Sequence, residues 1–210
     1  MKRINKITEE EMILEFLKGE FNSNRFNEDL RNALIKLNLN SNIISNGDLT
    51  NKKENLERLK IMKEYRGYPD EELFENFPTI YEWDYVKLSK EDIDKIYYID
   101  YDYWNELSNN TSKPLEAAKT IKEGREIFKV SNQPFIDGIK NIDSFPPIIL
   151  ITCNDEKYLI IEGHSRMTVY GLNPDKLEGT YAYIGYCTEE EMKKYDIRML
   201  KDESLKSRKY

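Results

Sequence analysis

The chain has 210 residues, of which 39% are hydrophobic, 34% charged and 12% aromatic, and its formal net charge at pH 7 is −7. This length suits one folded domain or a domain with an extension, and the aromatic content is incompatible with a disordered chain. Proteins that neutralise the phosphates of duplex DNA usually carry a positive field. We therefore expect no bulk nucleic-acid binding, whereas a local site for a small phosphate ligand remains compatible with this composition.

The first residues and the cysteines bear on location and chemistry. Residues 1–6 lack the apolar core and cleavage site of a signal peptide, and the most apolar run, 146–152, is too short to span a bilayer. Cys153 and Cys187 are the only cysteines, and His164 is the only histidine. This set disfavours a structural zinc site and indicates two reduced core thiols. We expect a cytoplasmic protein without membrane association.

Helical patterns dominate the part of the chain before residue 80. Thr8 and Glu11 form a capping box that begins the first helix, and Gly19 is expected to end it. An Asn- and Ser-rich stretch at 38–47 is typical of a loop. The predicted helices span residues 8–19, 27–37, 51–65 and 70–75.

From residue 81 the pattern mixes strands with helices. An extended segment is expected at 83–88, followed by strands at 125–130, 147–152, 158–161 and 179–187. Helices are predicted at 89–96, 113–122, 131–142, 163–172 and 188–195. We therefore expect an α+β protein with a small mixed sheet. Its predicted parts are a mainly helical N-terminal region at 1–112, an α+β core at 113–200 and a polar tail at 201–210.

The turn between the strand at 158–161 and the helix after it carries the clearest functional pattern, and it reads Glu162-Gly163-His164-Ser165-Arg166. The amino end of a helix directs free N–H groups and a partial positive charge outward, which favours anions. Gly163 permits a tight turn, Ser165 adds a hydroxyl and Arg166 adds a planar fork suited to phosphate. His164 is a further candidate donor. Glu162 is a candidate metal ligand or base.

The same five residues also have a purely structural interpretation. A glycine between a strand and a helix is common. In this interpretation Arg166 pairs with an acid and His164 is a satisfied surface group. The turn by itself leaves both interpretations open.

The order of elements around the turn resembles the ParB/sulfiredoxin superfamily. Its members share an apolar strand, a hairpin, a Gly-x-x-Arg turn, a helix and a closing strand, and the matching segments here are 147–150, 163–166 and 181–184. The resemblance covers roughly residues 125–187. It implies that Gly163, His164, Ser165 and Arg166 bind the phosphates of ATP or CTP, with Arg125 facing the turn as a second candidate.

Individual branches of the superfamily match the turn to different degrees. The turn is most similar to the Asp-Gly-His-His-Arg of the free-serine kinase branch, in which the acid lies beside the phosphates and matches Glu162 by type. Sulfiredoxins carry their reactive cysteine where His164 stands, so that activity is not implied. The partition proteins have a basic residue where Ser165 stands and a separate DNA-binding module.

A second candidate segment, 97–104, is dense in aromatic and acidic residues. It is suited to stacking a base or lining a pocket, with Asp100 or Asp102 holding Mg²⁺. The alternative is a buried aromatic segment between the two predicted regions, because aromatic residues dominate cores generally.

These observations predict a protein that binds a nucleoside triphosphate and Mg²⁺. One form of the prediction is a phosphotransferase or nucleotide hydrolase in which Glu162 and His164 are catalytic and Glu162 or Asp100 holds the metal. The alternatives are a non-catalytic, nucleotide-responsive regulatory protein and a DNA-associated nuclease of the ParB-like type. The net charge of −7 argues against the nuclease.

Overall fold

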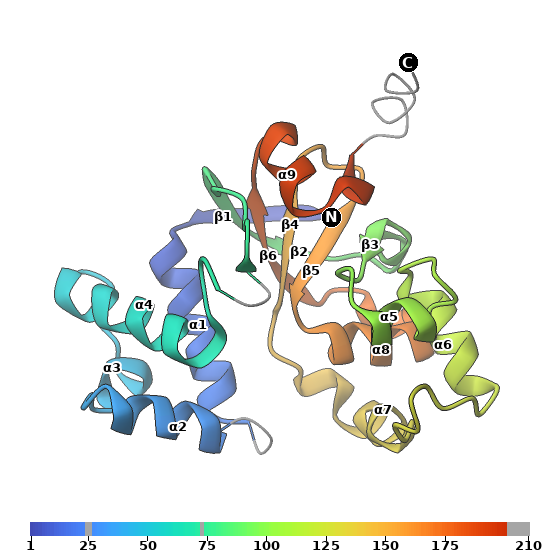
Figure 1. Cartoon of the computed structure of the whole chain (residues 1–210), viewed down its shortest axis with the longest axis horizontal. Helices are drawn as coiled ribbons and strands as arrows, with labels where there is room; N and C mark the ends of the chain where they lie inside the picture. The colour runs from blue at the N-terminus through green and yellow to red at the C-terminus, as the bar shows by residue number, and fades with distance from the viewer. Residues whose placement is uncertain (24–26, 72–73, 201–210) are drawn as a thin grey trace. The chain divides into compact units, whose positions relative to one another are not determined.

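A computed structural model describes residues 1–23, 27–71 and 74–200 (Figure 1). The chain divides into two compact units, one of Ile7–Phe77 and one of Met1–Lys6 with Pro78–Tyr210. The boundary predicted at residue 112 differs from this division, because residues 78–112 supply strands to the sheet of the second unit. The tail predicted at 201–210 lies outside the described residues.

The unit Ile7–Phe77 contains four helices in its described part. They are α1 (Glu9–Phe21), α2 (Asn27–Lys36), α3 (Asn42–Ser45) and α4 (Lys52–Arg66). The Thr8 hydroxyl accepts a hydrogen bond from the Glu11 N–H at 3.2 Å, so the predicted start of α1 is confirmed. Gly67 ends α4 in the left-handed conformation, with φ of 75°, as expected for a helix-terminating glycine.

Two predictions for this unit were wrong, and a third concerns a segment that the structure describes only in part. The first helix continues through Gly19 to Phe21, because the buried Glu20 accepts a bond from Arg66 at 2.7 Å and anchors the last turn. The loop expected at 38–47 contains α3, whose Ile44 is fully buried. The helix expected at 70–75 includes two residues outside the described ranges.

Within the described residues, six strands form one mixed sheet in the order β1-β2-β6-β4-β5-β3. Their bounds are β1 (Lys2–Ile7), β2 (Glu82–Lys87), β3 (Ile96–Tyr97), β4 (Ile148–Thr152), β5 (Tyr158–Glu162) and β6 (Tyr181–Tyr186). β6 lies antiparallel to β2 and parallel to β4, while β5 lies antiparallel to β4 and parallel to β3. The expected α+β class with a mixed sheet is confirmed.

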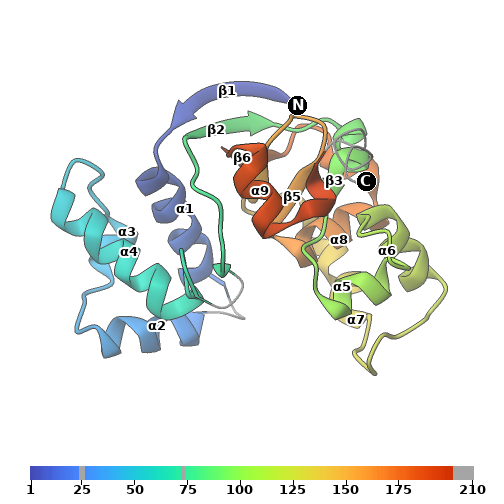
Figure 2. The same cartoon turned by 45° about the horizontal axis from the view of Figure 1, so that its top comes forward.

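The sheet differs from expectation at two places. Figure 2 shows β1 alongside β2 at the sheet edge, where β1 exposes most of its side chains and so lacks an apolar pattern. Ion pairs across these strands include Arg3 with Asp84 at 2.5 Å. The prediction of a strand at 125–130 was wrong. Phe128 and Lys129 have left-handed φ angles of 51° and 61°, so the chain turns sharply there.

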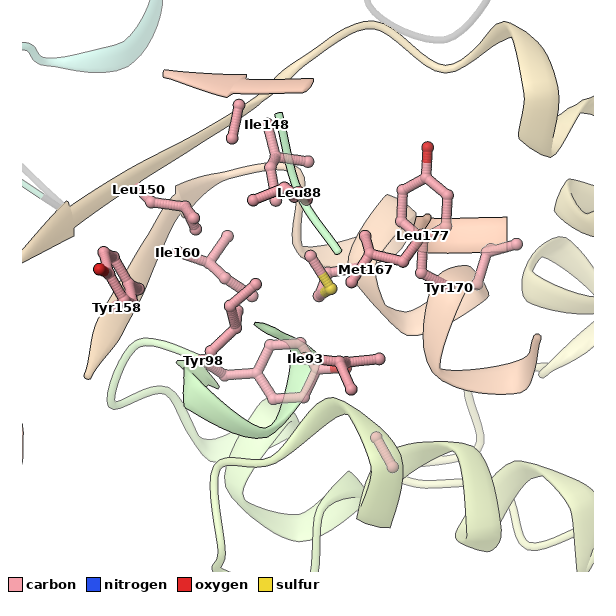
Figure 3. Close-up of a cluster of buried hydrophobic side chains, with 14 of the residues drawn as sticks. Leu88, Ile93, Tyr98, Ile148, Leu150, Tyr158, Ile160, Met167, Tyr170 and Leu177 are labelled. Carbon is pink, nitrogen blue, oxygen red and sulfur yellow. The ribbon is translucent and has the colours of Figure 1, made fainter. Parts of the chain in front are cut away.

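Helices cover one face of the sheet. They include α5 (Asp102–Leu107), α6 (Pro114–Lys122), α7 (Gln133–Gly138) and α8 (His164–Leu172), which lie together in Figure 1. Figure 3 shows Leu150 and Ile160 of the strands in one buried cluster with Tyr98, Met167 and Tyr170. The helix expected at 131–142 is α7 followed by the 3₁₀ segment η3 (Ile139–Ser144). The described part ends with α9 (Glu189–Tyr195) and η5 (Ile197–Met199).

The contact between α6 and α8 depends on Gly171. A Cβ atom at this position would lie 2.6 Å from the carbonyl oxygen of Pro114, which is backbone and cannot rotate away. We expect Gly171→Ala to lower the free energy of unfolding by about 1–3 kcal/mol, despite the better helix propensity of alanine, because the helices must separate. Urea denaturation measures this change. Lys122→Ala, at an exposed position of α6, is the matched control, and equal stability of Gly171→Ala and the parent would contradict the close packing.

Candidate functional site

The turn that joins β5 to α8 is built around Gly163. This residue has φ of 104°, and a Cβ atom here would lie 2.5 Å from Cγ2 of Ile148 on β4. Only glycine fits both constraints, because the left-handed backbone is strained and the space is taken for any other residue. The turn is thereby pressed against the sheet, and α8 starts directly at its edge.

The amino end of α8 has no side-chain cap within the described part of the chain. The N–H of Met167 is satisfied by the Gly163 carbonyl at 2.8 Å. The N–H groups of residues 164–166 precede it in the first turn, where an α-helix offers them no partner of its own. The Ser165 hydroxyl is half-buried and makes no hydrogen bond with any described residue. These donors lie together at the positive end of the helix dipole.

Arg166 is turned toward the protein. Its Nη1 donates to the carbonyl oxygens of Pro146 and Pro147, both at 2.7 Å, and its Nη2 donates to Oε1 of Glu162 at 3.3 Å. Only 16% of the Arg166 side chain and 25% of the Glu162 side chain are exposed. Arg166 therefore ties the entry of β4 to the end of β5. A phosphate could reach the guanidinium only through its remaining N–H groups or by displacing Glu162.

The salt bridge between Arg166 and Glu162 is an ion pair of the kind that the purely structural interpretation of the turn expects. Glu162, the expected metal ligand or base, has a guanidinium as its partner. Direct readout of phosphate by a free Arg166 fork is not the arrangement observed. The donors that the turn offers to a ligand are therefore main-chain groups, the N–H groups of residues 164–166.

His164 lies in an aromatic environment. Its ring is nearly parallel to Trp104, with 5.4 Å between centroids, and to Tyr98, with 6.2 Å. Burial lowers the pKa of His164 to about 4, an effect that Glu162 and a hydrogen bond to the Ile160 carbonyl oppose and Arg166 reinforces. The imidazole is therefore neutral at pH 7. Its Nε2 is buried and has no hydrogen-bond partner among the described residues.

Hydrogen bonds link this aromatic group to α8. Tyr98 and Thr168 share a buried hydrogen bond of 2.7 Å between their hydroxyls, and Thr168 donates to the His164 carbonyl at 2.8 Å. Burial raises the pKa of Tyr98 well above its usual range, so the phenol stays protonated. Arg198 donates to the Tyr98 carbonyl at 3.2 Å. The segment of 97–104 thus contributes a fixed wall beside the amino end of α8.

Two predicted site residues have their partners elsewhere. Arg125 is exposed and donates to Asn109 and to Thr120, the latter at 3.0 Å, and it makes no hydrogen bond or ion pair with the turn in the described ranges. Asp100 has 70% of its side chain exposed and accepts from Asn105 at 2.7 Å. The described residues contain no group of three His, Cys, Asp or Glu side chains that could hold a metal ion.

Sequence reasoning missed several residues that shape the site. The carbonyls of Pro146 and Pro147 hold Arg166, and backbone acceptors leave no pattern in a sequence. Thr168 lies one helical turn after His164, and this i, i+4 spacing was the available signal for its bond to the His164 carbonyl. Trp104 belonged to the aromatic segment, but its pairing with the turn depends on tertiary packing.

No protein-family model matches the chain, and comparisons with curated proteins and with solved structures found no significant match. The resemblance to the ParB/sulfiredoxin superfamily therefore stays a prediction, which rests on the turn and on the order of elements around it. None of the described helices is both long and apolar enough to cross a membrane.

The arrangement is suited to binding an anion and poorly suited to acid–base chemistry. The N–H groups of 164–166 and the Ser165 hydroxyl are donors without acceptors in the described structure. Glu162 is engaged by Arg166, and the basic nitrogen of His164 is buried with a lowered pKa. Proton transfer at either group would require the site to rearrange.

His164 is the only histidine, so its imidazole NMR signals need no assignment by mutation. We expect them to titrate with a midpoint near 4 instead of 6.5. Because the unfolded chain binds the proton at higher pH, the free energy of unfolding should fall between pH 6.5 and 4, by about 3 kcal/mol in total. His164→Phe keeps an aromatic ring but cannot titrate, so it should lose this part of the pH dependence. An imidazole midpoint near 6.5 would show that the ring is solvated.

Proposed function

We propose that this protein binds a nucleoside triphosphate, with the phosphates at the amino end of α8. The observation that carries the proposal is the uncapped first turn of α8, which follows a glycine that no other residue can replace. The N–H groups of 164–166 and the Ser165 hydroxyl hold the phosphate oxygens. Main-chain donors and the helix dipole favour anions without any need for a positively charged protein.

In this proposal Arg166 acts mainly as a positioning residue. Its bonds to Pro146, Pro147 and Glu162 fix the turn, and its charge offsets that of Glu162 beside the incoming phosphates. Without that compensation a carboxylate next to the site would repel the ligand. The guanidinium therefore supports binding even while all its observed contacts are internal.

The choice of a triphosphate rests on the context of the turn. The order of β4, hairpin, β5, turn, α8 and β6 is the order on which the resemblance to the ParB/sulfiredoxin superfamily is based. In that superfamily the turn binds ATP or CTP, so the ParB/sulfiredoxin-like fold and the ligand class belong to one proposal. Mg²⁺ enters as the companion of the phosphates, since Mg²⁺ is usually held by few carboxylates together with substrate phosphates and water.

The proposal is binding that alters the state of the protein, not turnover. Glu162 and His164 are the residues expected to be catalytic. Glu162 is paired with Arg166, and the Nε2 of His164 is buried and its pKa is lowered. This favours the nucleotide-responsive alternative over a phosphotransferase. A regulatory protein needs the phosphate site but does not need a free base.

A panel of ATP, CTP and GTP, each with and without Mg²⁺, tests the proposal by thermal shift and calorimetry. At about 100 times its dissociation constant a ligand adds roughly 2.7 kcal/mol of stability, which gives a clear shift. Ser165→Ala should weaken binding by about 10- to 100-fold, since a hydrogen bond to a charged group contributes about 1.5–3 kcal/mol. Ser45→Ala removes an exposed serine hydroxyl from the other unit and should leave the affinity unchanged.

The same panel distinguishes this function from its competitors. If Ser165→Ala and Arg166→Ala both bound every nucleotide as well as the parent, the site would be abandoned. If the parent released phosphate and Glu162→Gln lost this activity while keeping its affinity, an enzyme would replace the binding protein.

A further inference from the structure

The two cysteines of the chain lie at matched positions on neighbouring strands. Cys153 follows the last residue of β4, and Cys187 follows the last residue of β6. The two strands are parallel, and their register pairs Thr152 with Tyr186. The next matched positions along this register are Cys153 and Cys187, and matched residues of parallel strands direct their side chains to the same face of the sheet.

The hydrogen bonds place the thiol of Cys187 near Cys153. The N–H of Cys187 donates to the Thr152 carbonyl oxygen at 3.0 Å, which continues the pairing of β4 with β6 beyond the strands. The Cys187 Sγ lies 3.6 Å from that same oxygen. The oxygen belongs to the peptide group that leads into Cys153, so this Sγ lies within about 6.4 Å of the Cys153 Cα by standard backbone dimensions.

The register of β4 and β6 places the two Cα atoms at the spacing of neighbouring strands, and this spacing suits a covalent bond between the two thiols. The Cα atoms of a disulfide usually lie about 4.4–6.8 Å apart, and neighbouring strands lie about 4.7–4.9 Å apart. Neither cysteine is disulfide-bonded in this structure, and Cys153 is more exposed than Cys187. The Cys153 Sγ lies 3.9 Å from the carbonyl oxygen of Met199 in η5.

We propose that Cys153 and Cys187 form a reversible intramolecular disulfide when the protein meets a small disulfide such as oxidised glutathione. The half-buried Cys153 reacts first: its thiolate attacks the small disulfide, forms a mixed disulfide and releases one small thiol. The Cys187 sulfur then attacks the Cys153 Sγ, and the bond to the second small thiol breaks. That thiol leaves with the proton from Cys187, so the protein loses two electrons and two protons and the small disulfide gains them.

The environment of Cys187 determines the rate of the second step. Burial, together with smaller contributions from Cys153 and Glu191, raises the pKa of Cys187 to about 12. Since the thiolate is the attacking species, oxidation should be slow at pH 7 and should quicken toward pH 9. The bond would join the ends of two central strands, so it reports the redox state of the surroundings through the stability of the sheet.

The test uses the full chain equilibrated with reduced and oxidised glutathione at pH 8.5, quenched with acid and analysed by intact mass. The expected product is a monomer that is lighter by about 2 Da and regains this mass with a reducing agent. The ratio of disulfide to dithiol protein at a known glutathione ratio gives the effective concentration of one cysteine thiol toward the other. The same equilibration in urea gives this effective concentration for the unfolded chain. We expect the effective concentration of the two thiols to be at least tenfold higher in the folded protein than in urea.

Single variants and the urea reference decide the outcome. Cys187→Ser should stop at the mixed disulfide of Cys153. Cys153→Ser, which keeps only the buried Cys187, should form little mixed disulfide, and neither variant should give the product that is lighter by about 2 Da. An effective concentration in the folded protein equal to or below that in urea would overturn the proposal, because the fold would then not favour the bond. Covalent dimers in place of the lighter monomer would overturn it as well. Neither result bears on nucleotide binding at α8.

Discussion

The close approach of the turn at Gly163 to strand β4 is the constraint on which the candidate site depends. A Cβ atom at this position would overlap Ile148, so the backbone of the turn lies where a side chain would otherwise pack. Arg166 holds the arrangement from the other side through Pro146 and Pro147. The helix therefore begins at a fixed place on the sheet, and the direction of its free N–H groups is fixed with it.

This constraint also limits the chemistry of the residues in the turn. His164 begins the helix, and its ring is carried into an aromatic environment with Trp104 and Tyr98. An imidazole in such surroundings stays neutral, because burial disfavours its charged form. Glu162 ends the strand and meets the guanidinium that secures the turn. The residues that looked most reactive in the sequence are thus used to build the site, and the main chain supplies its donors.

Local features of the sequence were predicted well where a few neighbouring residues decide the structure. Thr8 and Thr188 each accept a bond from an N–H three residues later, as expected for capping residues. The apolar run of β4 is buried throughout, which is typical of a central strand. The strand at 125–130 failed because Phe128 and Lys129 form a tight turn that their residue types do not favour. β1 was missed because an edge strand held by ion pairs needs no apolar alternation.

The sequence by itself determined the class of the fold, most of its helix starts, the central hairpin and the glycine turn before α8. These features depend on contacts between residues close along the chain, which a local pattern records. Only the tertiary structure decided the partners of Arg166, the burial of His164 beside Trp104 and the juxtaposition of Cys153 with Cys187. Each of these depends on which distant segments the sheet and its helices bring together, and on the desolvation that follows, so no spacing along the chain could have specified them.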